Sequence, residues 1–135
     1  TPEPQPMSLP TTLETAFFQC STIEEAENLI NNCVTREAMV GFHNSQGIHI
    51  KSSPSVTEFV GYTEEDLMGQ SAYDFFHPDD FQTILKSHAE VTVTKEVNRV
   101  EYRMLKKDGT YKHVSTLSKT LKDQNEVEFI LTLTF

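Results

Sequence analysis

Residues 97–135 read VNRVEYRMLKKDGTYKHVSTLSKTLKDQNEVEFILTLTF and predict three antiparallel strands in succession. The first strand ends near Leu105, and the dipeptide Asp108-Gly109 suits a tight hairpin turn because glycine tolerates positive φ. A second, polar turn begins at Lys122. Because side chains alternate between the two faces of a strand, each strand has one face that is more apolar than the other. Such a sheet must bury its apolar face against another layer.

The final strand alternates most clearly, and it decides how we expect the sheet to face. We expect its odd-numbered side chains to point inward against helices: Val127, Phe129, Leu131, Leu133 and Phe135. We expect its even-numbered side chains on the opposite, outer face: Glu128, Ile130, Thr132 and Thr134. With Val114 and Thr116 from the preceding strand, this outer face is predicted to be a β-branched surface that is open to a partner.

The residues before this stretch predict a hairpin followed by helices. Ala38–Phe42 and Gly47–Lys51 read as two short strands joined by a polar turn. Short helical pieces follow, and then a longer helix is predicted to bury four residues at helical spacing: Phe81, Ile84, Leu85 and His88. The fold class is therefore α+β, a five-stranded antiparallel sheet with short helices on one face.

The amino-terminal part of the chain is expected to lie outside this domain. Residues 1–10 contain several prolines and no apolar run, so we expect a disordered leader. Residues 11–35 are expected to form an N-terminal extension of two short helices, begun by capping-box patterns at Thr11 and at Ser21. Residues 36–135 are expected to form the α+β domain. The extension either packs on the domain and stabilises it or detaches from it to report a state.

Composition excludes several classes of function. The net charge of −9 argues against direct contact with nucleic acid, whose phosphates would repel the domain. The sequence has no run of roughly 18 apolar residues and no signal segment, so we expect an intracellular protein, cytoplasmic or nuclear, without membrane contact. Cys20 and Cys33 are expected to be free thiols, and their spacing from His43 and His49 matches no familiar zinc pattern.

Three motifs resemble those of PAS domains, and they keep the order and spacing of that family. They are Gly61-Tyr62-Thr-Glu-Glu-Asp-Leu67-Met-Gly69, Tyr73-Asp-Phe-Phe-His77-Pro-Asp-Asp80 and Lys107-Asp-Gly109-Thr-Tyr111. The resemblance covers about residues 38–135. The runs His43–Tyr62, Ser71–His77 and Glu101–Leu105 are most similar to the second PAS domain (PAS-B) of eukaryotic basic helix-loop-helix/PAS transcription regulators, which include circadian clock proteins. Unlike that group, this chain has no tryptophan.

The resemblance implies a binding module and not an enzyme. It implies a sensory and protein-interaction module of a transcriptional or clock regulator, which pairs with another PAS domain or regulatory protein as a homodimer or heterodimer. The hollow between the helices and the sheet is expected to admit a small apolar ligand that tunes this pairing. The alternative is a ligand-gated or cofactor-gated sensor of the signal-transduction kind, as in sensor kinases.

Neither a catalytic site nor a bound cofactor is expected. PAS photoreceptors that form a flavin adduct use a cysteine on or just before the long helix, and residues 69–91 contain none. His88 lies on that helix, but a lone inward histidine is more often a hydrogen-bonded core residue than a haem ligand. We therefore expect no metal and no cofactor, with neither haem nor noncovalent flavin favoured.

Two sets of residues are the candidate functional sites. The candidate cavity lining is Phe42, Ile50, Phe59, Phe76, Ile84, His88, Tyr102, Met104 and Leu131. The candidate interface is Leu13, Phe17, Val114, Thr116, Ile130 and Thr132. Leu13 and Phe17 share one face of the first predicted helix, so that helix is a candidate to cover the outer sheet face in cis.

Overall fold

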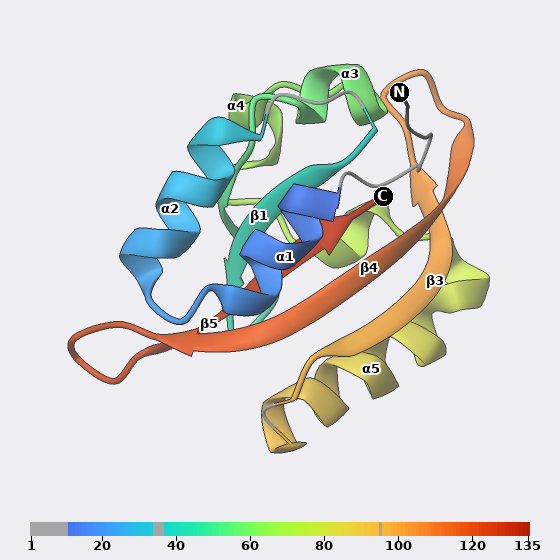
Figure 1. Cartoon of the computed structure of the whole chain (residues 1–135). Coiled ribbons are helices and arrows are strands. Elements are labelled where there is room, and N and C mark those ends of the chain that lie inside the picture. Colours follow the sequence, from blue (N-terminus) through green and yellow to red (C-terminus); the bar gives the residue numbers. More distant parts are fainter. Residues whose placement is uncertain (1–10, 34–36, 95) are drawn as a thin grey trace.

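The computed structural model describes residues 11–33, 37–94 and 96–135, which form a five-stranded antiparallel sheet packed between helices (Figure 1). The strands are β1 (Met39–Asn44), β2 (His49–Ser52), β3 (Asn98–Leu105), β4 (Tyr111–Lys122) and β5 (Glu128–Thr134). Their order in the sheet is β2-β1-β5-β4-β3, so the first and last strands in the sequence lie side by side at its centre. The predicted fold class is confirmed; the expected leader, residues 1–10, lies outside the described residues.

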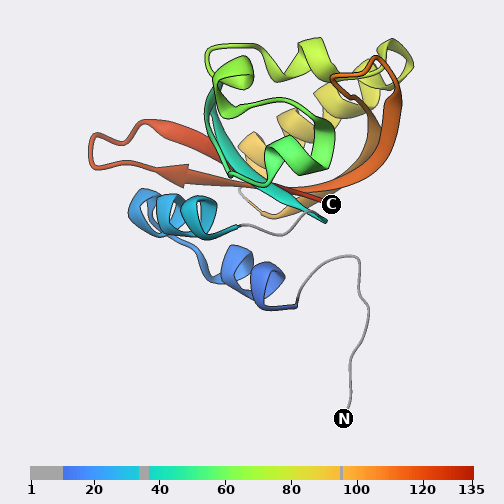
Figure 2. The ribbon, with the colours of Figure 1, turned by 90° about the horizontal axis from the view of Figure 1, so that it is seen from above.

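Helices cover both faces of the sheet. The elements are α1 (Thr11–Gln19), α2 (Ile23–Asn32), α3 (Val56–Val60), α4 (Glu64–Leu67), the 3₁₀ turns η1 (Ala72–Phe75) and η2 (Pro78–Asp80), and α5 (Phe81–Thr94). Figure 2 shows α1 and α2 on one side of the sheet and the helices between β2 and β3 on the other. We call the side toward α1 and α2 the outer face and the side toward α3, α4 and α5 the inner face. Within the described residues, no helix is long and apolar enough to cross a membrane.

The two sets of β5 side chains lie on the opposite faces of the sheet from those predicted. Leu131 and Leu133 are completely buried in the outer-face cluster, which also contains Phe17 of α1. Ile130 and Thr132 point to the inner face, where they line a cavity. The prediction was wrong because both faces are covered: the more apolar residue set packs against α1 and α2, and the more polar set faces the hollow side. Val127, predicted to point inward, precedes β5 and is exposed.

The N-terminal helices are held to the sheet by apolar packing and by one lysine. Leu13 and Phe17 of α1 belong to the outer-face cluster. At the end of α1, the Lys119 ammonium of β4 donates hydrogen bonds to the carbonyls of Phe17, Phe18 and Cys20. A cation suits this position because the last carbonyls of a helix have no partner within the helix and carry partial negative charge. Lys119 therefore fastens α1 to the sheet.

The start of α2 lies one residue later than its predicted cap. Thr22 Oγ1 accepts a hydrogen bond from the Glu25 amide at 3.1 Å, and Glu25 Oε1 accepts one from the Thr22 amide at 3.2 Å. This is a capping box. The predicted box began at Ser21, but in the structure Ser21 only supplements it, because its amide and hydroxyl both donate to Glu25 Oε1.

The long helix α5 buries a more polar stripe than predicted. Its buried residues are Ile84, Ser87 and Val91, whereas Leu85 is 42% exposed. At about 100° per residue, Ser87 falls on the same side as Ile84 and Val91, and Leu85 turns away from it. Assigning Leu85 to the buried face was therefore wrong. A serine inside this stripe leaves space and a hydroxyl facing the sheet.

An ion pair joins the turn before α5 to the edge strand β3. The Asp80 carboxylate accepts hydrogen bonds from Arg103 at the backbone amide (2.8 Å), Nε (3.0 Å) and Nη2 (2.8 Å). These bonds lower the pKa of Asp80 to about 2. We expect Asp80→Asn to lower the free energy of unfolding at pH 7 by about 1–2 kcal/mol, because the pair is charge-assisted but partly exposed to solvent. Urea unfolding measures this loss.

The effect of Asp80→Asn is expected to depend on pH. Because the folded-state pKa of Asp80 lies below its ordinary value of 3.8, its stabilisation is complete above about pH 4 and disappears as pH falls toward about 2. The difference in stability between the unaltered protein and Asp80→Asn should shrink over that range. Asp79→Asn is the control, since the Asp79 side chain is 77% exposed. A difference that stays constant down to pH 2 would refute this account.

Candidate functional site

A cavity lies between the inner face of the sheet and the helices that cross it. Its volume is about 80 Å³, enough for several water molecules at roughly 10–15 Å³ each. Residues of β1, β2, η1, α5, β3, β4 and β5 contribute to its wall. Pockets that hold drug-sized ligands measure roughly 300–1,000 Å³, so a haem or a flavin does not fit this cavity as it stands. The cavity suits a molecule of a few heavy atoms.

One side of the cavity is a chain of hydroxyl groups. The Tyr102 hydroxyl lies 2.8 Å from Thr116 Oγ1, which lies 2.9 Å from Thr134 Oγ1. The three residues sit on β3, β4 and β5, whose register brings them together across the inner face. Burial raises the pKa of Tyr102, so the phenol stays protonated. Each hydroxyl in this chain already has a hydrogen-bond partner within the protein.

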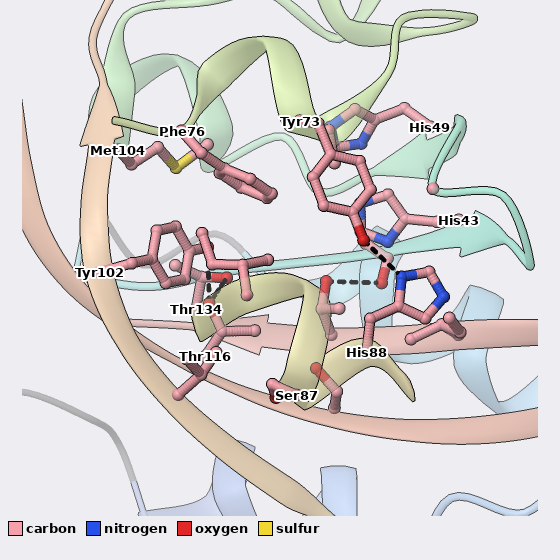
Figure 3. A pocket seen from close by; sticks show the side chains of 18 of the residues that line it. His43, His49, Tyr73, Phe76, Ser87, His88, Tyr102, Met104, Thr116 and Thr134 are labelled. Atoms are coloured by element: carbon pink, nitrogen blue, oxygen red, sulfur yellow. Dashed lines mark hydrogen bonds between the residues drawn. The ribbon is translucent and has the colours of Figure 1, made fainter. Parts of the chain in front are cut away.

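The other side of the cavity is lined by histidines and a tyrosine, as Figure 3 shows. The Tyr73 hydroxyl and His88 Nδ1 are 2.8 Å apart and share a hydrogen bond between η1 and α5. His43 and His49 face each other across the β1–β2 hairpin, with ring centroids 4.4 Å apart. His49 also contacts the edge of the Phe75 ring.

These histidines are neutral at physiological pH. Burial lowers the pKa of His49 to about 4. Burial, together with the neighbouring His49 and His88 rings, lowers the pKa of His43 well below its ordinary value. Burial also lowers the pKa of His88. Among the described residues that line the cavity, none is Asp, Glu, Lys or Arg. The cavity is therefore uncharged, with a mostly apolar wall that carries several polar groups.

Two buried polar atoms of residues that line the cavity have no hydrogen-bond partner among the described residues. They are His49 Nδ1 and Ser52 Oγ, both on β2. His49 is 5% exposed and Ser52 is 3% exposed, so bulk water does not satisfy them. Burying a polar group without a hydrogen bond is costly. Across the described chain, no group of three or more His, Cys, Asp or Glu could hold a metal ion.

The structure divides the predicted cavity residues between the two faces. Phe76, Ile84, His88, Tyr102 and Met104 line the cavity. Phe42, Ile50 and Leu131 do not, because they pack in the outer-face cluster. For Ile50 the reason is a register shift between Phe42 and His43, which inserts an extra residue on β2 and changes the alternation. Phe59 belongs to the inner-face core but not to the cavity wall.

The predicted interface residues are also divided. Leu13 and Phe17 are buried against the outer face. Thr116, Ile130 and Thr132 line the cavity, and Val114 belongs to the inner-face core, so none of these four lies on an exposed outer surface. Sequence reasoning overlooked His43, His49, Ser52 and Tyr73 as cavity residues. The short polar turn offered a signal for two of them, because it pairs His43 with His49 across the hairpin.

Comparisons with known proteins agree with this architecture. A family model described as "PAS fold" matches residues 49–133, well over half of the chain. Hypoxia-inducible factor 1-alpha of Gallus gallus is 38% identical over 61 residues, which are 45% of this chain and 8% of that protein. The Mus musculus protein of the same name is also 38% identical over 61 residues, and the match covers 7% of it. The chain thus matches only a small part of these relatives.

Solved structures share the fold over most of the chain. The PAS-B domain of Cycle from Drosophila melanogaster superposes with a TM-score of 0.67 and 22% identity, covering 72% of this chain and 97% of that one. A PAS domain from Colwellia psychrerythraea gives a TM-score of 0.70 and 18% identity, covering 84% and 94%. At these identities the structures support the fold alone. With the family match, they establish that the chain belongs to the PAS family, with a domain like the PAS-B domains of basic helix-loop-helix/PAS regulators.

Proposed function

We propose that this PAS domain is a protein-interaction module of an intracellular regulator of transcription or of the clock, and that it associates with partners through its outer sheet face. Its partner is a second PAS domain, in a homodimer or heterodimer. The similarity to hypoxia-inducible factor 1-alpha supports the regulatory role. Contact with nucleic acid is not part of the proposal, since the net charge is −9.

The observation that carries this proposal is the apolar character of the outer face. Leu117, Leu121, Leu131 and Leu133 belong to one cluster on β4 and β5, and α1 and α2 cover them. A sheet face this apolar requires a cover, either from the same chain or from a partner. Among the described residues of α1, Leu13 and Phe17 pack on the strands, Lys119 donates hydrogen bonds to the end of the helix, and Phe18 is 49% exposed. We infer that α1 is a cover that a partner can displace.

Phe17→Asp tests whether α1 competes with a partner. Aspartate removes the buried Phe17 ring from the outer-face cluster and leaves a void there, so α1 should dock less tightly and self-association should increase. Because both copies in a homodimer must release α1, each ~1.4 kcal/mol lost from α1 docking in each chain raises the apparent association constant about a hundredfold while the docked form still predominates. Sedimentation velocity over a concentration series measures the association, and hydrogen exchange reports whether α1 has been released.

Phe18→Asp is the matched control, because the neighbouring side chain is already half exposed and its replacement should leave the association constant unchanged. The homodimer form of the proposal fails if Phe17→Asp folds, loses protection of the α1 amides and still sediments like the unaltered protein. A loss of association in Phe18→Asp would instead place the contact on the outside of α1.

The second candidate function is a ligand-gated sensor. It is favoured by the inner-face cavity and by the two polar atoms of β2 that have no partner among the described residues. In that case the domain first binds a ligand, and ligand binding then controls its association with a partner. Native mass spectrometry of the purified protein, searching for a retained small molecule, separates a sensor that is loaded in the cell from a module that works by protein contact alone.

A further inference from the structure

The carbonyls at the end of α1 lack their usual helical hydrogen bonds. In a continuous helix the carbonyls of Phe17 and Phe18 would each accept from the amide four residues on. Those two amides, of Ser21 and Thr22, instead donate to Glu25 Oε1 at 2.9 and 3.2 Å, where they form the start of α2. The end of α1 therefore needs donors from outside the helix.

Lys119 of β4 supplies these donors from the sheet. Its ammonium nitrogen lies 3.0 Å from the Phe17 carbonyl oxygen and 3.1 Å from that of Phe18, and it also donates to the Cys20 carbonyl. The same nitrogen lies 5.5 Å from the centre of the Phe17 ring. The last turn of α1 contains no basic residue, so Lys119 is the cation that faces the partial negative charge at this helix end.

The hydrogen bonds of α2 separate it from α1. The Ser21 amide and hydroxyl both donate to Glu25 Oε1, so Ser21 is held by α2 and not by α1. At its other end, α2 is joined to the domain by Cys33, whose thiol lies 3.4 Å from the buried Ser55 hydroxyl. A boundary between a helix that moves and a helix that stays therefore falls between Cys20 and Ser21.

We propose that Lys119 is an autoinhibitory latch. Its ammonium holds α1 on the outer face, and loss of its charge and hydrogen bonds frees α1 about the Cys20–Ser21 junction while α2 stays docked. A charged donor makes stronger hydrogen bonds than a neutral one, so a single side chain determines how often this part of the face is uncovered. The inference rests on the proposed function, because an uncovered outer face has a role only if a partner binds there.

Cys20 and Cys33 report on the latch within one molecule. Cys20 is 5% exposed just after α1, and Cys33 is 3% exposed just after α2. Both are free thiols, so iodoacetamide labels each at a rate set by how often its surroundings open. Mass spectrometry of peptides from dilute protein measures the two labelling rates separately, and hydrogen exchange follows the α1 amides in parallel.

Replacements of Lys119 separate its charge from its packing. Lys119→Met keeps the length of the side chain and removes its charge and donors. We expect Cys20 to be labelled at least about tenfold faster than in the unaltered protein, as for the loss of one charge-assisted hydrogen bond, while the labelling rate of Cys33 stays unchanged. Lys119→Arg restores a charged donor and should return the Cys20 rate toward that of the unaltered protein.

Lys122→Met is the matched control. Lys122 lies on the same strand, but its side chain is 53% exposed and its ammonium lies 3.6 Å from a Glu126 carboxylate oxygen. This replacement removes one positive charge from β4 without touching the end of α1. We therefore expect it to leave the labelling rates of Cys20 and Cys33 unchanged.

Three outcomes would overturn the latch. The first is a Cys20 labelling rate that Lys119→Met does not change. The second is faster labelling of Cys20 and Cys33 together, which would mean that α1 does not open by itself. The third is equally fast labelling of Cys20 in Lys119→Arg and Lys119→Met, which would mean that the charge does not hold α1.

The labelling experiment needs no partner, so it tests the latch separately from association. If Lys119→Met frees α1 and still sediments like the unaltered protein, the latch stands and the homodimer form of the proposed function fails. If Lys119→Met leaves the labelling of Cys20 unchanged, the latch fails, and the sedimentation of Phe17→Asp still decides whether α1 competes with a partner.

Discussion

Replacing Leu131 with alanine is expected to lower the free energy of unfolding by about 2–5 kcal/mol, the usual cost of a large-to-small change in a packed core. Leu131 is completely buried in the central strand β5, between Phe42 of β1 and Lys119 of β4 in the register of the sheet. Its side chain packs in the outer-face cluster beneath the N-terminal helices. Truncation leaves a void that the surrounding strands cannot close by moving. Urea unfolding followed by circular dichroism measures the loss.

Val127→Ala is the matched control for Leu131→Ala. Val127 has the same parity in the sequence and was expected on the same face, but it precedes β5 and is 49% exposed. Its replacement should change the free energy of unfolding by less than about 0.5 kcal/mol. Losses of similar size in the two variants, or a loss below 1 kcal/mol in Leu131→Ala, would contradict the burial of the odd-numbered side chains beneath α1 and α2.

The buried His49 ring is expected to make the fold sensitive to mild acid. Its pKa falls from an ordinary 6.5 to about 4 on folding. Between pH 6.5 and pH 4, the unfolded chain binds a proton at His49 that the folded chain excludes. The contribution of the neutral His49 to the free energy of unfolding is therefore fully present above about pH 6.5 and is lost as pH falls toward 4. One group with this shift costs about 3 kcal/mol across that range. Burial also lowers the pKa of His43 and of His88, so both act in the same direction.

Urea unfolding between pH 8 and pH 5 isolates this histidine effect, because the carboxylates titrate below that window. In His49→Phe, the slope of stability against pH between pH 5 and pH 6 should be shallower by about 1.4 kcal/mol per pH unit, which corresponds to one proton. His113→Gln is the control for the replacement of a histidine, since the His113 side chain is 69% exposed. An unchanged slope in His49→Phe would show that His49 is not held neutral by burial.

The sequence was sufficient to predict the order of elements but not the assignment of faces. Strand alternation shows that Leu131 and Leu133 share a face and that Thr132 and Thr134 share the other. It cannot show which helices cover each face, because a sheet with helices on both sides buries both residue sets. The more apolar residue set, which contains Leu131 and Leu133, was predicted to pack against the helices that follow β2, but it packs against α1 and α2.

The cavity was predictable in place but not in chemistry. Tyr102, Met104, Ile84 and His88 were recovered because period-two and helical spacing identify inward side chains. His49 was overlooked because a polar residue on a short strand is usually exposed, and because the register shift on β2 hides the alternation there. Such bulges depend on pairing between distant strands, so local sequence does not reveal them.

The helices α1 and α2 pack on one side of the sheet and the inner-face helices on the other. The strand β5 therefore separates two compartments, the outer-face cluster and the inner-face cavity. Neighbouring residues of β5 therefore belong to different compartments: Thr132 lines the cavity, while Leu131 and Leu133 pack beneath α1 and α2.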